Sequence, residues 1–137
     1  MVGVDRSLVR LTRLLETYRA SLGSQCYRPI SAGKIDVLCF DCSTGTWPFM
    51  PAVFGGAVMV DFYSRDIIPH VAESMMPGAI LFIETPKGHG RNHLSLPLRG
   101  SVKAALAPWF DLMSYLERHA GPKISETVSV VALACRR

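Results

Sequence analysis

The sequence lacks any run of about 18 consecutive apolar residues, so it predicts no membrane-spanning helix. Its first residues also lack the apolar core of a secretory signal peptide, and we therefore expect a cytoplasmic protein. Charged residues are few: they make up 19% of the 137 residues, whereas hydrophobic residues make up 49%. This balance predicts one α/β domain over residues 1–137, with a substantial core and strands covered on both faces.

Cysteine residues are also few, with four in the chain. Cys39 and Cys42 form a C-x-x-C, but they lie at the end of an apolar stretch instead of opening a helix, where the helix dipole would lower the thiol pKa. A metal site would need a second pair of ligands at similar spacing, and the sequence offers none. We therefore expect reduced, structural cysteines and no metal.

A strong excess of one charge is absent as well, because the net charge is only +4. The basic residues that gather near the start of the chain are interrupted by Glu16; they are Arg6, Arg10, Arg13 and Arg19. We interpret them as the solvated face of a helix, with an RNA-binding face as the alternative. Nucleic acid is thus a possible partner that the sequence does not specifically indicate.

The glycine-rich turn of nucleotide-binding domains is missing, although the chain begins like one of their units. Residues 2–5, Val-Gly-Val-Asp, read as a buried strand that ends in an acid, and Ser7 is placed to cap a helix that starts at Leu8. Such a unit places a carboxylate on a ribose diol, but a first strand and a glycine-rich turn normally precede it. Only Met1 precedes it here. We expect a cofactor-binding domain without its opening strand.

Apolar periodicity and the positions of Gly and Pro predict strands that alternate with helices. The expected strands are 2–5, 35–41, 57–62, 79–84, 110–117 and 127–134, and the expected helices are 8–22, 65–75 and 101–106. Residues 85–98 are expected to form a long functional or covering loop. Alternation favours an open, mostly parallel sheet, and the last two strands suggest an antiparallel hairpin at its edge.

The order of five motifs is similar to that of class I S-adenosylmethionine-dependent methyltransferases, from the second strand of that fold to the last. The motifs are Val-Gly-Val-Asp-Arg-Ser at 2–7, Phe-Asp-Cys at 40–42, Trp-Pro-Phe at 47–49, Val-Asp-Phe-Tyr-Ser-Arg-Asp at 60–66 and Met-Pro-Gly-Ala-Ile-Leu-Phe-Ile-Glu-Thr at 76–85. The last resembles the family's "P-G-G-x-L-x-x-E-T". Gly-His-Gly-Arg-Asn at 88–92 and Leu-Pro at 96–97 narrow the resemblance to the small bacterial-type, tellurite-resistance-like group.

The resemblance implies S-adenosylmethionine as cofactor and assigns residues to it. Asp5, with Arg6 beside it, matches the acid that accepts hydrogen bonds from the ribose hydroxyls. Asp41 matches the acid that meets the adenine amino group, and Cys42 supplies backbone beside it. A third group lies alongside the methionine moiety: Asp61, Phe62 and Tyr63. Methyl transfer needs mainly alignment and exclusion of water, so the resemblance assigns no catalytic residue and no metal.

Simpler alternatives remain open for several of these residues. Asp5 is also a favoured helix-entry residue that supports Ser7, and Asp41 is also a turn former before Ser-Thr-Gly. Trp47 is interpreted as a packing residue, with a stacking platform for adenine as the alternative. Glu84 is read as a strand-end acid that orders the following loop.

The strand that the chain lacks is central in the family, whose strand order resembles 3-2-1-4-5-7-6. Because adjacent strands lie about 4.8 Å apart, its loss leaves a gap of roughly 10 Å between residues 2–5 and 57–62. Three explanations are open: these strands close up, a partner chain or second copy supplies the missing strand, or the chain is an incomplete gene product. We expect the third.

The function predicted is therefore methyl transfer from S-adenosylmethionine to an unidentified acceptor, with an incomplete cofactor site. The alternative is a degenerate methyltransferase-like protein that acts as a non-catalytic structural or binding subunit. A dehydrogenase is disfavoured because its own glycine fingerprint is absent and because the chain ends in antiparallel strands.

Overall fold

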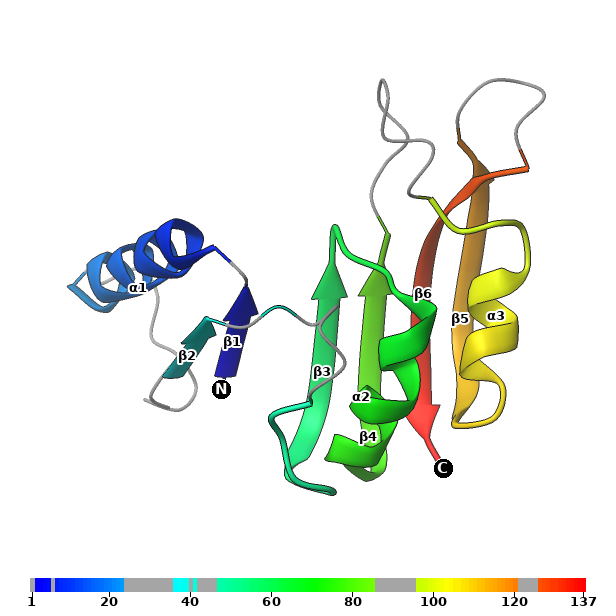
Figure 1. Cartoon of the computed structure of the whole chain (residues 1–137), viewed down its shortest axis with the longest axis horizontal. Helices are drawn as coiled ribbons and strands as arrows, with labels where there is room; N and C mark the ends of the chain where they lie inside the picture. The colour runs from blue at the N-terminus through cyan, green and yellow to red at the C-terminus, as the bar shows by residue number, and fades with distance from the viewer. Residues whose placement is uncertain are drawn as a thin grey trace. The chain divides into compact units, whose positions relative to one another are not determined.

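The computed structural model describes residues 2–5, 7–23, 36–39, 41, 47–85, 96–120 and 126–137. They belong to two compact units, Met1–Thr46 and Trp47–Arg137, each with its own sheet (Figure 1). The elements of the first unit are β1 (Val2–Asp5), α1 (Leu8–Gly23) and β2 (Asp36–Cys39). Those of the second are β3 (Phe54–Val60), η1 (Arg65–Ile67), α2 (Ile68–Ser74), β4 (Met75–Glu84), α3 (Ser101–Leu106), β5 (Phe110–His119) and β6 (Val128–Arg136).

The first unit is a parallel strand pair whose connection runs through α1. β1 and β2 pair in parallel from Val2↔Asp36 to Asp5↔Cys39. The predicted helix cap is confirmed, because the Ser7 hydroxyl oxygen accepts a hydrogen bond from the Arg10 N–H at 3.4 Å. Among the leucines of α1, Leu11 is buried, whereas Leu8 is 66% exposed.

The sheet of the second unit has the strand order β3-β4-β6-β5 (Figure 1). β3 and β4 are parallel, and β6 pairs antiparallel with β4 on one side and with β5 on the other. The predicted antiparallel hairpin is therefore present, with β5 and not β6 at the edge of the sheet. The order matches the 4-5-7-6 part of the family order.

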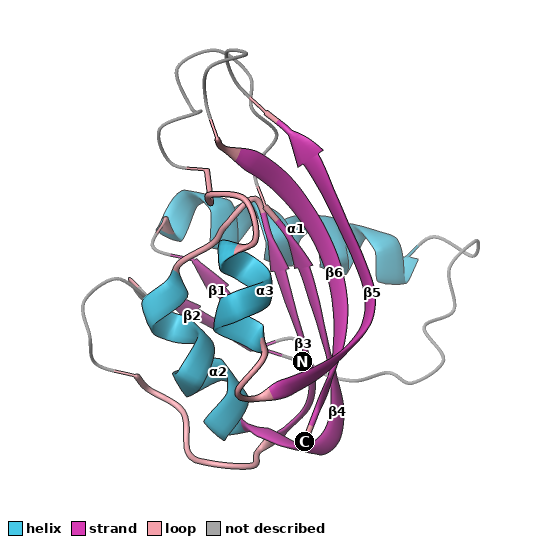
Figure 2. Cartoon of the chain, turned by 90° about the vertical axis from the view of Figure 1, so that its right-hand side faces the viewer, coloured by secondary structure: helices cyan, strands magenta, loops and turns pink. Residues whose placement is uncertain are grey.

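Both helices of the second unit cover the same face of its sheet (Figure 2). Alternate residues of the strands point to this face, as the pleat requires, and pack against the buried sides of α2 and α3. The buried residues are Ile68, Val71 and Ala72 from α2, Val102 and Leu106 from α3, Leu81 and Ile83 from β4, Phe110 from β5, and Val128, Val130, Ala132 and Ala134 from β6. This single layer of apolar contacts is the core of the unit.

The other face of this sheet differs from the expectation that strands are covered on both faces. Val58 and Val60 on β3 are 71% and 52% exposed, and Leu116 and Val131 farther along the sheet are also exposed. Among the residues described, no helix of this unit covers that face.

The helix predicted over 65–75 is divided into the 3-10 turn η1 and the helix α2. Ser64 has the extended backbone of an N-cap, but its side chain makes no capping hydrogen bond. The cause of the division is Pro69, which has no N–H to donate to the Arg65 carbonyl oxygen. The Ile68 N–H donates to that oxygen instead, which is the tighter 3-10 pattern.

β4 begins four residues earlier than predicted, because Pro77-Gly78 does not end the preceding helix. Helix α2 passes directly into the strand at Met75, whose backbone is already extended. The pairing with β3 shifts between Phe54↔Met75 and Gly56↔Ile80, and Gly78 has a φ of 80° inside this irregular stretch. Glycine tolerates that left-handed conformation, so the strand continues past it.

Trp47 ties the start of the second unit to α2. Its indole N–H donates to the Ser74 hydroxyl oxygen at 2.6 Å, and the buried Ser74 hydroxyl donates to the His70 carbonyl oxygen at 2.9 Å. The Trp47 ring also stacks on His70, with centroids 5.9 Å apart, and meets Phe49 edge-on. The packing interpretation of Trp47 is confirmed by these contacts.

Arg136 ties the last strand to the end of α2. Its Nε donates to the Ala72 carbonyl oxygen at 2.9 Å, and its Nη1 donates to the Trp109 carbonyl oxygen at 3.1 Å. The guanidinium carbon lies 5.7 Å from the centroid of the Trp109 ring. One side chain thus joins β6, α2 and the turn before β5.

We predict that R136K lowers the free energy of unfolding by about 1–2 kcal/mol, because an ammonium group does not span both carbonyl oxygens. Its neighbour gives a matched control: Arg137 makes an exposed ion pair with Asp111 at 2.7 Å. R137K should cost less than about 0.5 kcal/mol. Urea unfolding of the two variants measures both changes, and equal losses would contradict the role given to Arg136.

S74A should leave the Trp47 N–H without its partner and lower the free energy of unfolding by about 1–3 kcal/mol. The loss should be smaller when Trp47 is already phenylalanine, since the donor is then absent, so a double-mutant cycle should give a coupling energy of about 1 kcal/mol. S114A, at an exposed position on β5, is the control. Additive losses in the cycle would show that the Trp47–Ser74 hydrogen bond does not stabilise the unit.

Candidate functional site

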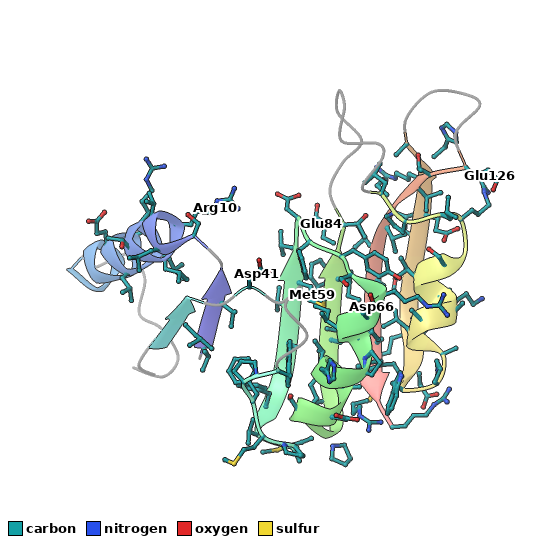
Figure 3. The ribbon with its side chains drawn as sticks, in the orientation of Figure 1. Arg10, Asp41, Met59, Asp66, Glu84 and Glu126 are labelled. Atoms are coloured by element: carbon teal, nitrogen blue, oxygen red, sulfur yellow. The ribbon has the colours of Figure 1, made fainter. Side chains whose placement is uncertain are left out.

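The carboxyl ends of the parallel strands β3 and β4 lie side by side, which is the edge where ligands bind in open α/β sheets. Val60 pairs with Glu84, and the Asp61 N–H then donates to the Glu84 carbonyl oxygen at 2.9 Å. Figure 3 shows Glu84 at this end of β4. The same row of paired residues continues across the sheet, because Glu84 pairs with Val131 on β6 and Val131 pairs with Leu116 on β5. We call this end of the second unit its carboxyl edge.

The backbone turns sharply where β3 ends. Asp61 has a φ of 52°, a left-handed conformation that few residues other than glycine adopt and that aspartate tolerates better than most. Strained backbone of this kind is concentrated at binding sites. The turn takes the chain out of the sheet into Phe62 and Tyr63, and the Phe62 side chain is 39% exposed. The structure therefore brings all three predicted residues of this group to the carboxyl edge.

Thr85 holds the carboxyl edge to the antiparallel part of the sheet. It is fully buried; its hydroxyl oxygen accepts from the Val130 N–H at 2.8 Å, and its own N–H donates to the Val130 carbonyl oxygen at 2.9 Å. These two bonds continue the β4–β6 pairing one residue beyond Glu84. The position of the edge is thus fixed by backbone pairing on both of its sides.

Four polar side chains gather beside the carboxyl edge; we call them the polar cluster, and they are Tyr63, Ser101, Tyr115 and Glu117. The Glu117 carboxylate accepts one hydrogen bond from the Tyr115 hydroxyl and one, at 2.8 Å, from the Gly100 N–H. The Ser101 hydroxyl donates to the Leu98 carbonyl oxygen at 2.7 Å. Glu117 therefore connects β5 to the residue that precedes α3.

Both tyrosines of the polar cluster keep their protons well above neutral pH. Burial raises the pKa of Tyr63, against the smaller opposing effects of the Ser101 hydroxyl and the Arg65 charge. Burial also raises the pKa of Tyr115, and its hydrogen bond to the Glu117 carboxylate, together with that negative charge, raises it further. The two phenols are therefore hydrogen-bond donors under ordinary conditions.

In the first unit, two of the predicted acids lie at the carboxyl end of a parallel pair. Asp5 and Cys39 are the last paired residues of β1 and β2, and Asp41 follows two residues later. Asp41 is partly exposed. The backbone thus places Asp5 and Asp41 at the same end of this sheet. Arg6 and Cys42 lie outside the described residues.

The described residues were also compared with the requirements of a metal site and of a membrane span. Within the described ranges, no group of three His, Cys, Asp or Glu side chains could hold a metal ion. Cys135 on β6 is a free, partly buried thiol. No described helix is long and apolar enough to cross a membrane.

Sequence reasoning missed three members of the polar cluster: Ser101, Tyr115 and Glu117. One signal was available, since two polar residues two positions apart on a predicted strand share one of its faces. Their partners, however, come from segments far away in the sequence, and only the folded chain brings Tyr63 and Gly100 to them.

No protein-family model and no curated protein sequence matches the chain. Solved structures do match. A SAM-dependent methyltransferase from Methanosarcina mazei has a TM-score of 0.67 and 16% identity, with 98% of this chain and 81% of that one covered. The [4+2]-cyclase SpnF has a TM-score of 0.67 and 13% identity, with 98% and 65% covered. The N-methyltransferase NodS from Bradyrhizobium japonicum, in complex with S-adenosyl-L-homocysteine, has a TM-score of 0.60 and 12% identity, with 98% and 65% covered.

These likenesses concern the fold, because identities of this size do not carry an activity from one protein to another. One of the similar structures is described as a cyclase, which illustrates that limit. The chain also spans 65% of the chain in the SpnF structure and 65% of the chain in the NodS complex, which is less than two thirds of each. With its mixed sheet and inserted antiparallel strand, this chain has the Rossmann-like fold of the S-adenosylmethionine-dependent methyltransferases.

Proposed function

We propose that this chain is an S-adenosylmethionine-dependent methyltransferase domain that acts on an acceptor not yet identified. The observation that supports it best is the strand order β3-β4-β6-β5, with β6 antiparallel between two other strands, in a chain that aligns over 98% of its length with a methyltransferase structure. The motifs at 88–92 and 96–97 support placing it in the small bacterial-type, tellurite-resistance-like group.

The proposed cofactor-binding residues are Asp5, Arg6, Asp41, Cys42, Asp61, Phe62 and Tyr63. Asp5 and Asp41 fit such a role, because Asp5 is the last residue of β1 and Asp41 follows the end of β2 by two residues. An ionised carboxylate can accept hydrogen bonds from both hydroxyls of a ribose, or from an adenine amino group. Asp61 fits for a different reason, namely the strained turn that it makes at the carboxyl edge.

The sulfonium of S-adenosylmethionine supplies an activated methyl group when it is bound. The chain then has to bind, orient and exclude water, and no metal or covalent nucleophile is required. The exposed side chain of Phe62 offers an apolar surface at the carboxyl edge that helps to exclude water. Glu84, in the same edge, ends β4 and carries its side chain on the face opposite to the buried Ile83.

A non-catalytic structural or binding subunit is the second candidate. One observation favours it: the described strands form two separate sheets, and β3 is paired along one edge only, with β4. An unpaired strand edge is a template for another strand, so a partner chain or a second copy would complete the sheet there.

Calorimetric titration with S-adenosylhomocysteine tests the first candidate. We expect saturable binding to the wild-type chain, and binding about 10- to 100-fold weaker to D5N, because a neutral amide loses a charge-assisted hydrogen bond. The control is D36N, whose residue lies at the opposite, amino end of β2, and its affinity should stay within about twofold of the wild type. If a folded wild-type sample shows no binding of S-adenosylhomocysteine, the enzyme proposal is refuted and the binding subunit is favoured.

A further inference from the structure

One face of the sheet in the second unit carries apolar side chains that no described helix of that unit covers. Directly paired residues point to the same side of a sheet, so the ladders show which residues share this face. Two adjacent rows of the ladders supply its apolar residues: Val58, Phe82 and Leu133 in one row, and Val60, Val131 and Leu116 in the other. We call this side of the sheet the open face, and Figure 2 shows α2 and α3 on the side opposite to it.

Four apolar side chains of the open face are well exposed: Val58 at 71%, Val60 at 52%, Leu116 at 46% and Val131 at 39%. Single exposed apolar residues are common at protein surfaces, but a contiguous apolar patch marks an interaction surface. In addition, β3 and β4 are parallel, and parallel strands are normally covered on both faces. The open face is therefore suited to dock a flat apolar partner.

Two residues of opposite charge lie near the two ends of β5 on the open face. Asp111 pairs with Cys135 at one end, and Arg118 pairs with Ser129 at the other. Both β6 partners alternate with the buried residues of that strand, so Asp111 and Arg118 point to the open face. Arg118 is exposed, and the Asp111 side chain is 69% exposed although it makes an ion pair with Arg137.

This arrangement of charges is complementary to itself. A two-fold axis that runs between two stacked sheets, across their strands, makes the strands of the two copies antiparallel. Asp111 of each copy then faces Arg118 of the other, and the apolar rows of the two copies face one another. A symmetric dimer requires such a surface, since both copies use the same patch. Sheets that stack with nearly aligned strands form an apolar layer about 10 Å thick.

We propose that the open face is the interface of a homodimer, in which two copies of this chain stack their sheets with antiparallel strands and join Asp111 of each copy to Arg118 of the other. Four strands about 4.8 Å apart, each contributing about seven residues, give roughly 400 Å² of flat area per copy. A stable complex buries about 800 Å² per partner, so the dimer is weak, with a Kd of about 10–100 μM. This association goes beyond methyl transfer and does not depend on it.

Sedimentation velocity of the full chain under reducing conditions tests the dimer. Between about 5 and about 300 μM, the weight-average mass of the wild type should rise from that of a monomer towards that of a dimer. V58K places a charge in the apolar layer and should dimerise at least about tenfold more weakly. Its control is V9K, at a valine that is 64% exposed on α1 in the first unit, and V9K should match the wild type. A monomeric wild type, a V58K that still dimerises, or an equal loss in V9K would overturn the proposal.

Two charge reversals on β5 test how the copies are aligned. D111R brings arginine against arginine and R118D brings aspartate against aspartate, so each variant alone should dimerise about five- to tenfold more weakly. An equimolar mixture of the two should recover the affinity of the wild type, because its mixed dimer has opposite charges at both contacts. Recovery also shows that both variants are folded. A mixture that associates no better than either variant alone would rule out the proposed interface.

The same variants separate the open face from the edge of β3, where a second copy would instead add a strand. A dimer joined along that edge needs neither an uncharged open face nor the charges of β5. Such a dimer would persist in V58K, D111R and R118D, and the proposal would then be wrong. Titration with S-adenosylhomocysteine is independent of this result, since a wild type that binds none removes the methyltransferase proposal and leaves the dimer unaffected.

Discussion

The parallel pairing of β3 with β4 is the constraint on which the candidate site depends. Because the two strands run in the same direction, their carboxyl ends meet, and Asp61 and Glu84 are joined by a backbone hydrogen bond. Thr85 fastens the same end to β6 through two further bonds to Val130. The strained turn at Asp61 and the polar cluster are both placed by this edge.

Strand β6 connects the carboxyl edge to β5. By lying antiparallel between β4 and β5, it extends the row from Glu84 through Val131 to Leu116, so residues of the last hairpin reach the level at which β3 and β4 end. Arg136 and Trp47 then tie the helix-covered side together through the end of α2. The sheet that carries the carboxyl edge is thus joined to α2 by side-chain hydrogen bonds as well as by apolar packing.

Much of this fold was predictable because its strands are short apolar runs with clear ends. Residues 2–5 and 101–106 formed elements with the predicted bounds, and the resemblance supplied the strand order of the second unit. The failures have local causes. Pro69 converts the start of a predicted helix into a 3-10 turn, and Gly78 takes a left-handed φ that lets β4 run through a Pro-Gly pair read as a stop. Neither outcome follows from residue preferences alone.

The residues of the candidate site were likewise predictable from the sequence only in part. Asp5, Asp41 and Asp61 could be placed because each lies at or near the end of a predicted strand, and within each unit the parallel strands end at the same edge. Tyr115 and Glu117 could not be predicted as site residues, because they interact with Tyr63 and Gly100. Only the tertiary structure brings these two residues close to them. A sequence shows which residues share one face of a strand, but it does not show which residues of other elements pack against that face.

Amide hydrogen exchange with and without S-adenosylhomocysteine tests most directly the claim that the carboxyl ends of the strands form the site. The account predicts slower exchange in peptides that cover residues 4–7, 39–42 and 60–64, with the middle of the β5–β6 hairpin unchanged. Unchanged exchange throughout a folded chain, or protection confined to that hairpin, would contradict it.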